Sequence, residues 1–215
     1  MRRSNLEAEL LAAKVMNHCG VPCPRADYGW FKPEGGKTMR LLRVEFVNDA
    51  ISAADAWRNG LSIGEIDVSL FQRMQVVDVL IGNADRHMGN FMFVAGGKVV
   101  PIDHNLAFGT DMVFKSPSVT WQKCFLDTLH GLASSQRTSW ILRRNKYGWA
   151  ILEVEGVDSY WPIIEDIQRK LIDADIDRMV DELPDLLAEK ERKEELRRIL
   201  KWRRDHLKEL FEEAM

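Results

Sequence analysis

Two short apolar segments joined by a pair of glycines constrain the fold of this chain most. Residues 91–94 and 98–102 are rich in Phe, Val and Ile, and Gly96-Gly97 lies between them. Glycine accepts the positive φ angles that a tight two-residue turn requires. The segment therefore predicts a β-hairpin, with polar residues at the outer ends of both strands.

The register of this hairpin predicts a metal site. With a two-residue turn, Ala95 pairs with Lys98, and counting outward places Asn90 opposite Asp103. Directly opposed residues of an antiparallel pair have Cβ atoms about 4.5–5.5 Å apart on the same face. An amide oxygen and a carboxylate at that separation can hold one hard cation such as Mg²⁺. We therefore predict that Asn90 and Asp103 are magnesium ligands.

Asp85 precedes Asn90 by five positions, in the loop after a predicted helix. The same spacing occurs in phosphotransferase catalytic loops, where the Asp accepts the proton of the substrate hydroxyl and the Asn holds a metal ion. Each residue alone is better explained as a turn cap or a polar strand end. Asp85, Asn90 and Asp103 together favour a nucleotide and metal site for phosphoryl transfer, which requires positioning and charge neutralisation.

Helical periodicity accounts for the segments before the hairpin. Residues 5–19 carry apolar side chains at helical spacing, and Gly20 follows as a stop. Residues 66–81 show the same pattern, with Asp67 or Ser69 as the N-cap and Gly82 as the end.

The rest of the chain predicts one further hairpin and a helical C-terminal part. A strand pair turns at Gly35-Gly36, between the first two helices. Residues 158–183 predict one or two helices, Pro184 is a break, and residues 186–215 predict one long helix with a charged, solvated face. The expected fold class is α+β.

Composition excludes several classes of protein. The net charge is −3, which does not suggest a nucleic-acid or membrane-surface binder. No apolar run is long enough for a transmembrane helix, and Glu7, Glu9 and Lys14 interrupt the segment that a signal peptide would need. Three cysteines without framework spacing indicate a reducing compartment, so we expect a cytoplasmic protein.

The loop motifs resemble those of a known superfamily. "LIGNADRHMGNFMF" and "VVPIDHNLAFG" resemble the catalytic and metal-binding loops of HipA-like kinases and their relatives, the phosphatidylinositol 3- and 4-kinases, in which the order is Asp-Arg-His. "NLEAELLAAKVMNHCGVPCP" and "LRRILKWRRDHLKELF" are similar to their early and final helices. The resemblance implies a protein-kinase-like fold, with a reduced N-lobe at residues 1–50 and a helical C-lobe at residues 51–215.

The resemblance also implies roles for the loop residues. Asp85 would be the catalytic aspartate, and Asn90 and Asp103 would hold Mg²⁺. His87 would lie in the active site, near the transferred phosphoryl group or the Asp85 loop. Arg86 would anchor the loop rather than contact the substrate.

Other residues would bind ATP on this resemblance. Glu9 occupies the place of the helix glutamate that pairs with the nucleotide-binding lysine, although a solvated helix residue explains it equally well. Residues 43–47, with Glu45 and Val47, would be the hinge whose backbone holds adenine, or simply a core strand. His104 follows the metal aspartate, as it often does in HipA-like relatives.

Two kinase parts have no counterpart in this sequence. A Gly-rich loop and a strand lysine should precede the helix of Glu9, but only residues 1–4 do. The start could be truncated, a partner chain could supply the missing strands, or the protein could be a reduced kinase.

We favour an ATP- and Mg²⁺-dependent HipA-like serine/threonine kinase that phosphorylates a protein. The alternative is a pseudokinase or regulatory binding module. A lipid or small-molecule kinase ranks lower, because residues 104–119 contain only one lysine.

Overall fold

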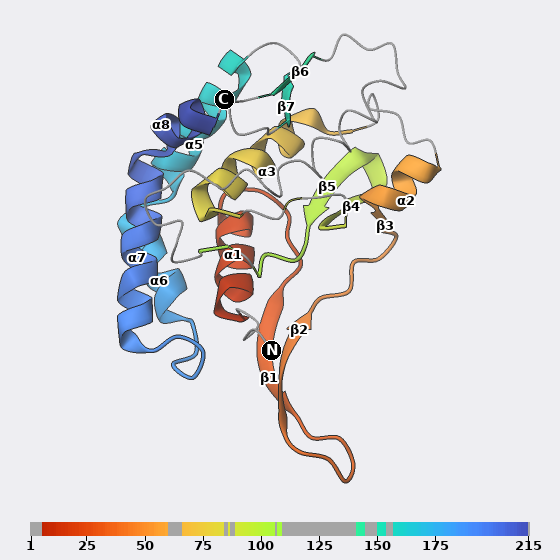
Figure 1. Ribbon diagram of the computed structural model, residues 1–215, viewed down its shortest axis with the longest axis vertical. Helices are drawn as coiled ribbons and strands as arrows, with labels where there is room; N and C mark the ends of the chain where they lie inside the picture. Colours follow the sequence, from red (N-terminus) through yellow and green to blue (C-terminus); the bar gives the residue numbers. More distant parts are fainter. Residues whose placement is uncertain are drawn as a thin grey trace.

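Small antiparallel sheets and a mostly helical C-terminal part make up the fold (Figure 1). The structure, a computed structural model, describes residues 6–59, 66–83, 86, 89–105, 107–108, 141–144, 150–153 and 157–214. The expected α+β class is confirmed. The division into lobes at residue 50 stays a prediction.

Two predicted helices form the centre of the molecule. Helix α1 (Leu6–His18) ends at Gly20, whose φ of 81° is typical of a C-terminal cap. Helix α3 (Val68–Ile81) is capped by Asp67, which accepts a hydrogen bond from the Leu70 amide at 3.0 Å. It ends at Gly82, which is left-handed. Both helices are confirmed with the predicted stops.

Helix α3 is the hub of the packing. Ten of its fourteen residues are buried. It contacts α1, strand β5 (Lys98–Pro101) and the C-terminal helices α5 (Trp161–Lys170), α7 (Lys190–Asp205) and α8 (Leu207–Ala214). The segment that contains the predicted catalytic and metal-binding residues follows the end of this helix, so the packed core fixes the position where that segment starts.

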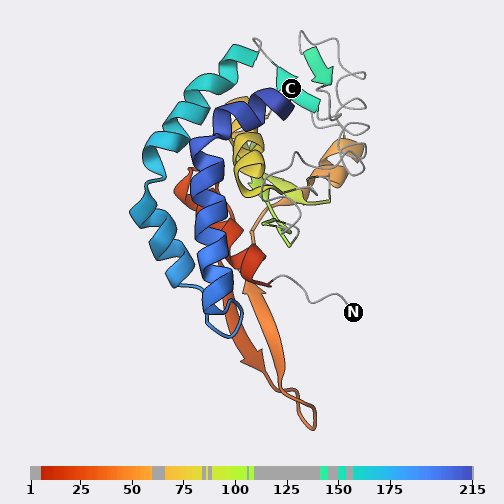
Figure 2. The ribbon, with the colours of Figure 1, turned by 60° about the vertical axis from the view of Figure 1, so that its left-hand side comes forward.

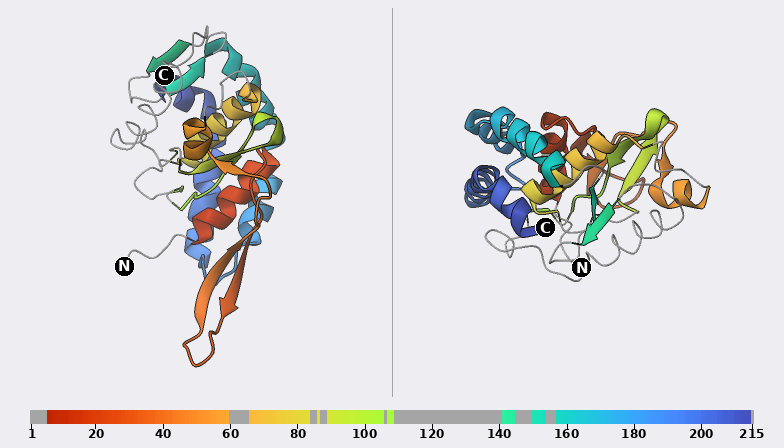
Figure 3. Two further views of the ribbon diagram at one scale, coloured as in Figure 1. Left: turned by 90° about the vertical axis from the view of Figure 1, so that its right-hand side faces the viewer. Right: turned by 90° about the horizontal axis from the view of Figure 1, so that it is seen from above.

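The first hairpin extends away from the rest of the molecule (Figures 1 and 3). Strands β1 (Ala26–Phe31) and β2 (Met39–Val44) form an antiparallel two-stranded sheet. Neither strand pairs with any other described strand. The turn between them follows the prediction, because Gly35 has a φ of 71° and the Gly36 amide donates to the Pro33 carbonyl at 3.0 Å.

Large apolar side chains of this hairpin are exposed. A two-stranded sheet is marginally stable in water unless another element covers it. We call these side chains the apolar hairpin surface. They are Trp30, Phe31, Met39, Leu41, Val44 and Phe46.

A second, three-stranded sheet carries the hairpin that the sequence predicts after α3. Its strand order is β3-β4-β5, all antiparallel. The strands are β3 (Ile51–Ser52), β4 (Phe91–Val94) and β5 (Lys98–Pro101), and helix α2 (Ala53–Arg58) follows β3. A separate pair, β6 (Ile141–Arg144) and β7 (Ala150–Glu153), lies near the C-terminal helices (Figure 1).

The predicted register of this hairpin is wrong by one residue. The connection is a three-residue turn, η2 (Ala95–Gly97), in which both glycines have positive φ angles of 78° and 69°. Three-residue turns with a left-handed glycine are a common hairpin connection. The third residue shifts the pairing, so Asn90 lies beside Ile102, whose amide donates to the Asn90 carbonyl at 3.0 Å. Asn90 is therefore not directly opposite Asp103.

The C-terminal part is a set of four packed helices. Figure 2 shows α7 running beside α6 and continuing into α8 after a bend. The predicted helix or pair over residues 158–183 is confirmed. The elements are η4 (Val157–Tyr160), α5 (Trp161–Lys170), α6 (Asp173–Asp181), α7 (Lys190–Asp205) and α8 (Leu207–Ala214).

The single long helix predicted over residues 186–215 is wrong, because the chain bends at His206. The backbone leaves the helical region there, with φ −107° and ψ 22°, and the imidazole stacks on Trp202 at 4.4 Å between ring centroids. The bend lets Phe211 pack against Tyr160, with ring centroids 4.8 Å apart. Helical periodicity continues across the bend, so the sequence pattern did not reveal it. Within the described ranges, no helix combines the length and apolarity needed to cross a membrane.

Candidate active site

The predicted catalytic loop starts at the C-terminal end of α3. Asp85 and His87 lie outside the described residues. Arg86, between them, is described and is only 7% exposed. Its contacts show how the loop is attached to the core.

Arg86 joins the end of α3 to the base of the second hairpin. Its Nε and Nη2 donate to the two carboxylate oxygens of Asp78 at 2.9 and 3.0 Å, a bidentate geometry. Its Nη1 donates to the carbonyls of Asn90 and of Ile102, the latter at 2.9 Å. Asn83 completes the cluster by donating to Asp78 at 2.9 Å. These contacts attach Arg86 to α3 and to the hairpin, and its role in the catalytic loop stays a prediction.

A second buried arginine supports the same helix end from the other side. Arg203 of α7 is 1% exposed and donates from Nε to the carbonyls of Val79 and Leu80 at 3.2 and 2.9 Å. These carbonyls belong to the last turn of α3, where a cation is favourable. Burial lowers the pKa of Arg203 to about 10.

Sequence reasoning missed both Asp78 and Arg203. The available signal was position: each charged residue interrupts an apolar stripe of its helix. Arg203 lies three residues after Leu200 and four before Leu207, and both leucines are buried. A charged side chain within an apolar stripe faces the core, and a buried charge needs a partner.

A pocket of about 590 Å³ lies between α1, the end of β2 and the end of β5. Four predicted site residues line it, although they lie in three distant segments of the sequence: Glu9, Glu45, Val47 and Asp103. The apolar part of the wall is formed by Leu6, Cys23, Pro24, Leu42, Val44, Phe46, Ala50, Met92, Pro101 and Ile102. The structure thus brings the predicted hinge segment and the predicted metal aspartate to one cavity.

Asn90 is placed differently from Asp103. Its side chain is buried at the start of β4, and it is not among the residues that line the pocket in the described part of the chain. Asp103 is exposed to the pocket, and its Oδ1 accepts a hydrogen bond from Asn105 Nδ2. Ile102, whose amide donates to the Asn90 carbonyl, is the residue directly before Asp103, and the two predicted ligands differ in their surroundings.

The charges that line the pocket are all acidic. Among its described lining residues the charged ones are Glu9, Glu45 and Asp103, and no lysine or arginine is present. Glu45 also accepts a hydrogen bond from the Arg25 amide at 3.2 Å. Such a wall attracts cations, and a nucleotide triphosphate would need metal ions or an added basic group to bind there.

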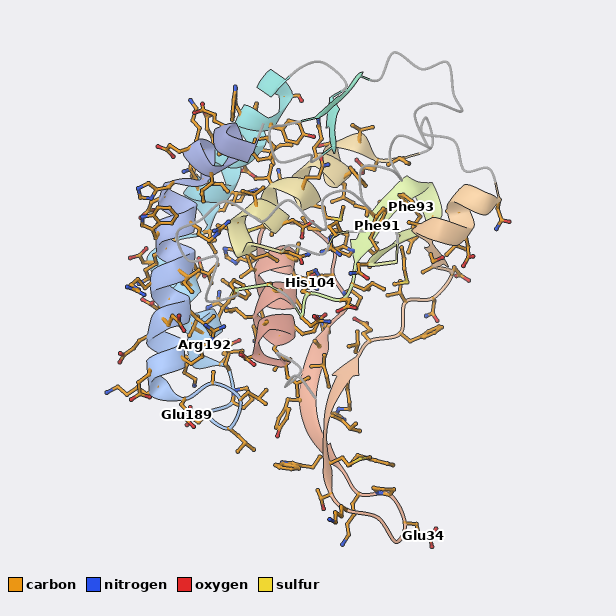
Figure 4. The ribbon with its side chains drawn as sticks, in the orientation of Figure 1. Glu34, Phe91, Phe93, His104, Glu189 and Arg192 are labelled. Atoms are coloured by element: carbon orange, nitrogen blue, oxygen red, sulfur yellow. The ribbon has the colours of Figure 1, made fainter. Side chains whose placement is uncertain are left out.

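Glu9 is not the solvated helix residue that one interpretation predicted. Its side chain is 12% exposed, and the carboxylate accepts a hydrogen bond from the His104 amide. The other carboxylate oxygen lies 3.3 Å from His104 Nδ1. Figure 4 places His104 beside helix α1. The pairing of Glu9 with a nucleotide-binding lysine stays a prediction.

The segment after Asp103 is attached to three helices. His104 contacts α1 through Glu9, and the Phe108 amide donates to the Ile81 carbonyl of α3 at 3.0 Å. The Phe108 carbonyl accepts a hydrogen bond from Arg192 of α7 at 3.0 Å. This segment is therefore fixed to the helical core at both ends.

Part of the chain is similar to a known kinase family, and its fold is similar to that of a solved kinase. Residues 42–119 match the family model of phosphatidylinositol 3- and 4-kinases, a span that contains every predicted site residue except Glu9. The crystal structure of a Helicobacter pylori proinflammatory kinase, CtkA, superposes with a TM-score of 0.59 and 16% sequence identity. The alignment covers the whole of this chain and 90% of CtkA. No curated protein sequence matches.

Part of this chain is thus similar to a kinase family, and the whole chain has a kinase-like fold. Its relation to phosphatidylinositol 3- and 4-kinases rests on the matched span, and its fold is that of CtkA. The narrower assignment to HipA-like kinases stays a prediction.

The donor atoms of the predicted metal ligands suit magnesium better than a soft metal. Asp103 and Asn90 offer hard oxygen ligands. Cys19 and Cys23 are buried, and burial raises the pKa of each thiol to about 12, so both are protonated. Among the described residues, no group of three or more His, Cys, Asp or Glu side chains is arranged to hold a metal.

Proposed function

We propose that this kinase-like domain is an ATP- and Mg²⁺-dependent phosphotransferase of HipA-like type that acts on a serine or threonine hydroxyl of a protein. One observation carries the proposal: the hinge segment and Asp103 line the same pocket, next to the loop that Arg86 anchors. A nucleotide held by the hinge would have its phosphates directed toward Asp103.

The proposed roles follow from the chemistry of the transfer. The substrate hydroxyl attacks the γ-phosphorus, the bond to the leaving ADP oxygen breaks, and Asp85 accepts the hydroxyl proton. Asp103 and Asn90 would hold Mg²⁺, which neutralises charge on the phosphate oxygens. The backbone near Glu45 and Val47 would hold adenine, and His87 would lie beside the transferred group.

The acidic pocket favours a second candidate. A kinase uses a lysine to pair the phosphates, and the described lining residues include no basic side chain. The domain could therefore be a pseudokinase or a regulatory module that binds without transfer.

A partner chain would reconcile the acidic pocket with catalysis. The apolar hairpin surface includes Val44 and Phe46, which also line the pocket. A strand that covered this surface could add a lysine to the pocket by pairing with an edge of the hairpin. This partner belongs to the proposal, together with the protein substrate.

A thermal-shift titration with ATP, with and without Mg²⁺, tests the proposal. Ligand at about a hundred times Kd stabilises a protein by about 2.7 kcal/mol, which is about 5–10 °C for a chain of this size. We expect the Mg²⁺-dependent part of the shift to disappear in Asp103→Asn. Asp49→Asn is the matched control, because Asp49 is also exposed and left-handed, with a φ of 55°, but does not line the pocket.

A transfer assay separates the two candidates. Labelled ATP is incubated with the domain and a protein acceptor, and in parallel with phosphatidylinositol vesicles. Asp85→Asn should keep the thermal shift and lose transfer. If Asp85→Asn transfers phosphate as well as the natural chain, the catalytic assignment is wrong. Binding without transfer by the natural chain supports the module, and transfer to the vesicles alone supports a lipid kinase.

A further inference from the structure

The residue after the predicted metal ligand is held unusually firmly. His104 is fully buried, and both its backbone amide and its Nδ1 face the carboxylate of Glu9. Its Nε2 has no hydrogen-bond partner within the described part of the chain. The Glu9 carboxylate is thus the polar partner of both the amide and the imidazole of His104 among the described residues.

The backbone of Asp103 explains why such an anchor matters. Asp103 has a φ of 56°, in the left-handed region that residues other than glycine rarely occupy. Such conformations persist only where the surrounding structure enforces them, and they gather at functional sites.

The orientation of the amide that Glu9 binds depends on the backbone conformation of Asp103. The His104 N–H belongs to the peptide unit that follows Asp103, so its direction is set by the ψ angle of Asp103. A hydrogen bond from this N–H to Glu9 therefore fixes that angle. The contact with Nδ1 holds the imidazole in place, which prevents the peptide from rotating away.

We infer that Glu9 and His104 form a positioning pair that fixes the peptide unit after the left-handed Asp103 and so keeps the Asp103 carboxylate directed into the pocket for Mg²⁺. The inference rests on the proposed function, since it concerns the same metal site. It gives Glu9 a role that does not depend on a nucleotide-binding lysine. Glu9 lies on α1 and Asp103 follows β5, so the pair also couples the position of α1 to the metal site.

Substitutions of Glu9 test the pair by Mg²⁺ affinity rather than turnover. The readout is the free Mg²⁺ concentration at half of the thermal shift produced by a saturating, non-hydrolysable ATP analogue. We expect Glu9→Ala to raise this concentration about tenfold, the lower end of the effect of removing a partner that orients a metal ligand. Glu9→Gln keeps an oxygen for the His104 amide and should raise it by no more than about threefold. The control Glu7→Ala removes a carboxylate of similar exposure, 17%, on the same helix.

Substitutions of His104 test the other half of the pair. His104→Asn keeps a side-chain donor near the position of Nδ1, so its Mg²⁺ midpoint should be close to that of the natural chain. His104→Phe keeps a buried ring without a donor, and we expect it to raise the Mg²⁺ midpoint several-fold. Circular dichroism and the unfolding midpoint without ligand show whether each variant is folded.

The outcomes distinguish the inference from the proposed function. If the natural chain shows no Mg²⁺-dependent shift, both fail. If it shows the shift but folded Glu9→Ala and His104→Phe keep the natural Mg²⁺ midpoint, the proposed function stands and the positioning pair is refuted. A Glu9→Ala variant that needs more nucleotide at saturating Mg²⁺, with an unchanged Mg²⁺ midpoint, also refutes the pair, because it assigns Glu9 to nucleotide binding.

Discussion

Replacing Arg86 by methionine removes the charge that joins α3 to the second hairpin while keeping a side chain of similar length. The side chains of Arg86 and Asp78 are 5% and 4% exposed, so solvent cannot replace the lost contacts. The change leaves the Asp78 carboxylate with the hydrogen bond from Asn83 as its remaining described side-chain contact. It also removes the shared donor of the Asn90 and Ile102 carbonyls.

The expected loss of stability follows from these contacts. Removing one partner of a buried ion pair costs about 3–5 kcal/mol, because the other charge stays buried without compensation. A domain is stable by only about 5–15 kcal/mol in total, so this is a large fraction. With a urea dependence of about 2–3 kcal/mol per molar, the unfolding midpoint should fall by about 1–2 M.

Urea unfolding followed by the fluorescence of the seven tryptophans measures this change. The matched control is Arg169→Met, which breaks an ion pair of 2.7 Å with Asp166 but whose arginine side chain is 75% exposed. Exposed pairs contribute about 0–1 kcal/mol. If Arg86→Met lowers the unfolding free energy no more than Arg169→Met does, the contacts of Arg86 do not stabilise the fold. The double variant Asp78→Leu/Arg86→Met should cost less than the sum of its single changes, because neither charge is then left alone.

Three further predictions concern buried or paired charges. Hydrogen bonding from Lys170 is the main reason that the pKa of Asp166 falls from 3.8 to about 2. The ionised Asp166 therefore stabilises the fold fully above about pH 4, and this stabilisation is lost as the pH falls toward 2. Asp166→Asn should therefore reduce the unfolding free energy at pH 7 by about 1–2 kcal/mol after solvent screening, and flatten its decline over that acidic range. Arg203→Lys should lower the unfolding free energy by about 1–3 kcal/mol, since one ammonium cannot replace the planar fork at the end of α3, and urea unfolding measures it. Cys19 and Cys23, whose thiols have pKa values raised to about 12 by burial, should react with a thiol reagent at pH 8 only after unfolding, and labelling of either of these two residues in the native chain would contradict this.

Local signals in the sequence predicted the elements well. Gly20 and Gly82 end helices because each adopts the left-handed conformation that such caps need, and Gly35 forms the turn of the first hairpin. Asp67 was one of two candidate caps, with Ser69, because a capping side chain acts within one helical turn, and the structure shows that Asp67 is the cap. These signals depend on neighbours in the chain, so the sequence contains the information directly.

Features that depend on distant residues were not predictable in the same way. One extra residue in the turn changed the register, because Gly96-Gly97 allows more than one turn type. The contacts of Glu9 with His104 and of Arg203 with α3 join residues about a hundred positions apart. Side-chain pattern marks such residues as unusual but does not identify their partners.

Arg203 has a consequence for how the molecule is made. Its partner Leu80 is 123 residues earlier in the chain, and a ribosome that adds about 5–20 residues per second needs about 6–25 s to cover that distance. During synthesis the last turn of α3 therefore lacks the hydrogen bonds from Arg203 until α7 has been made. We expect nascent chains stalled before residue 203 to be cut by protease near Gly82, while chains stalled beyond α8 resist.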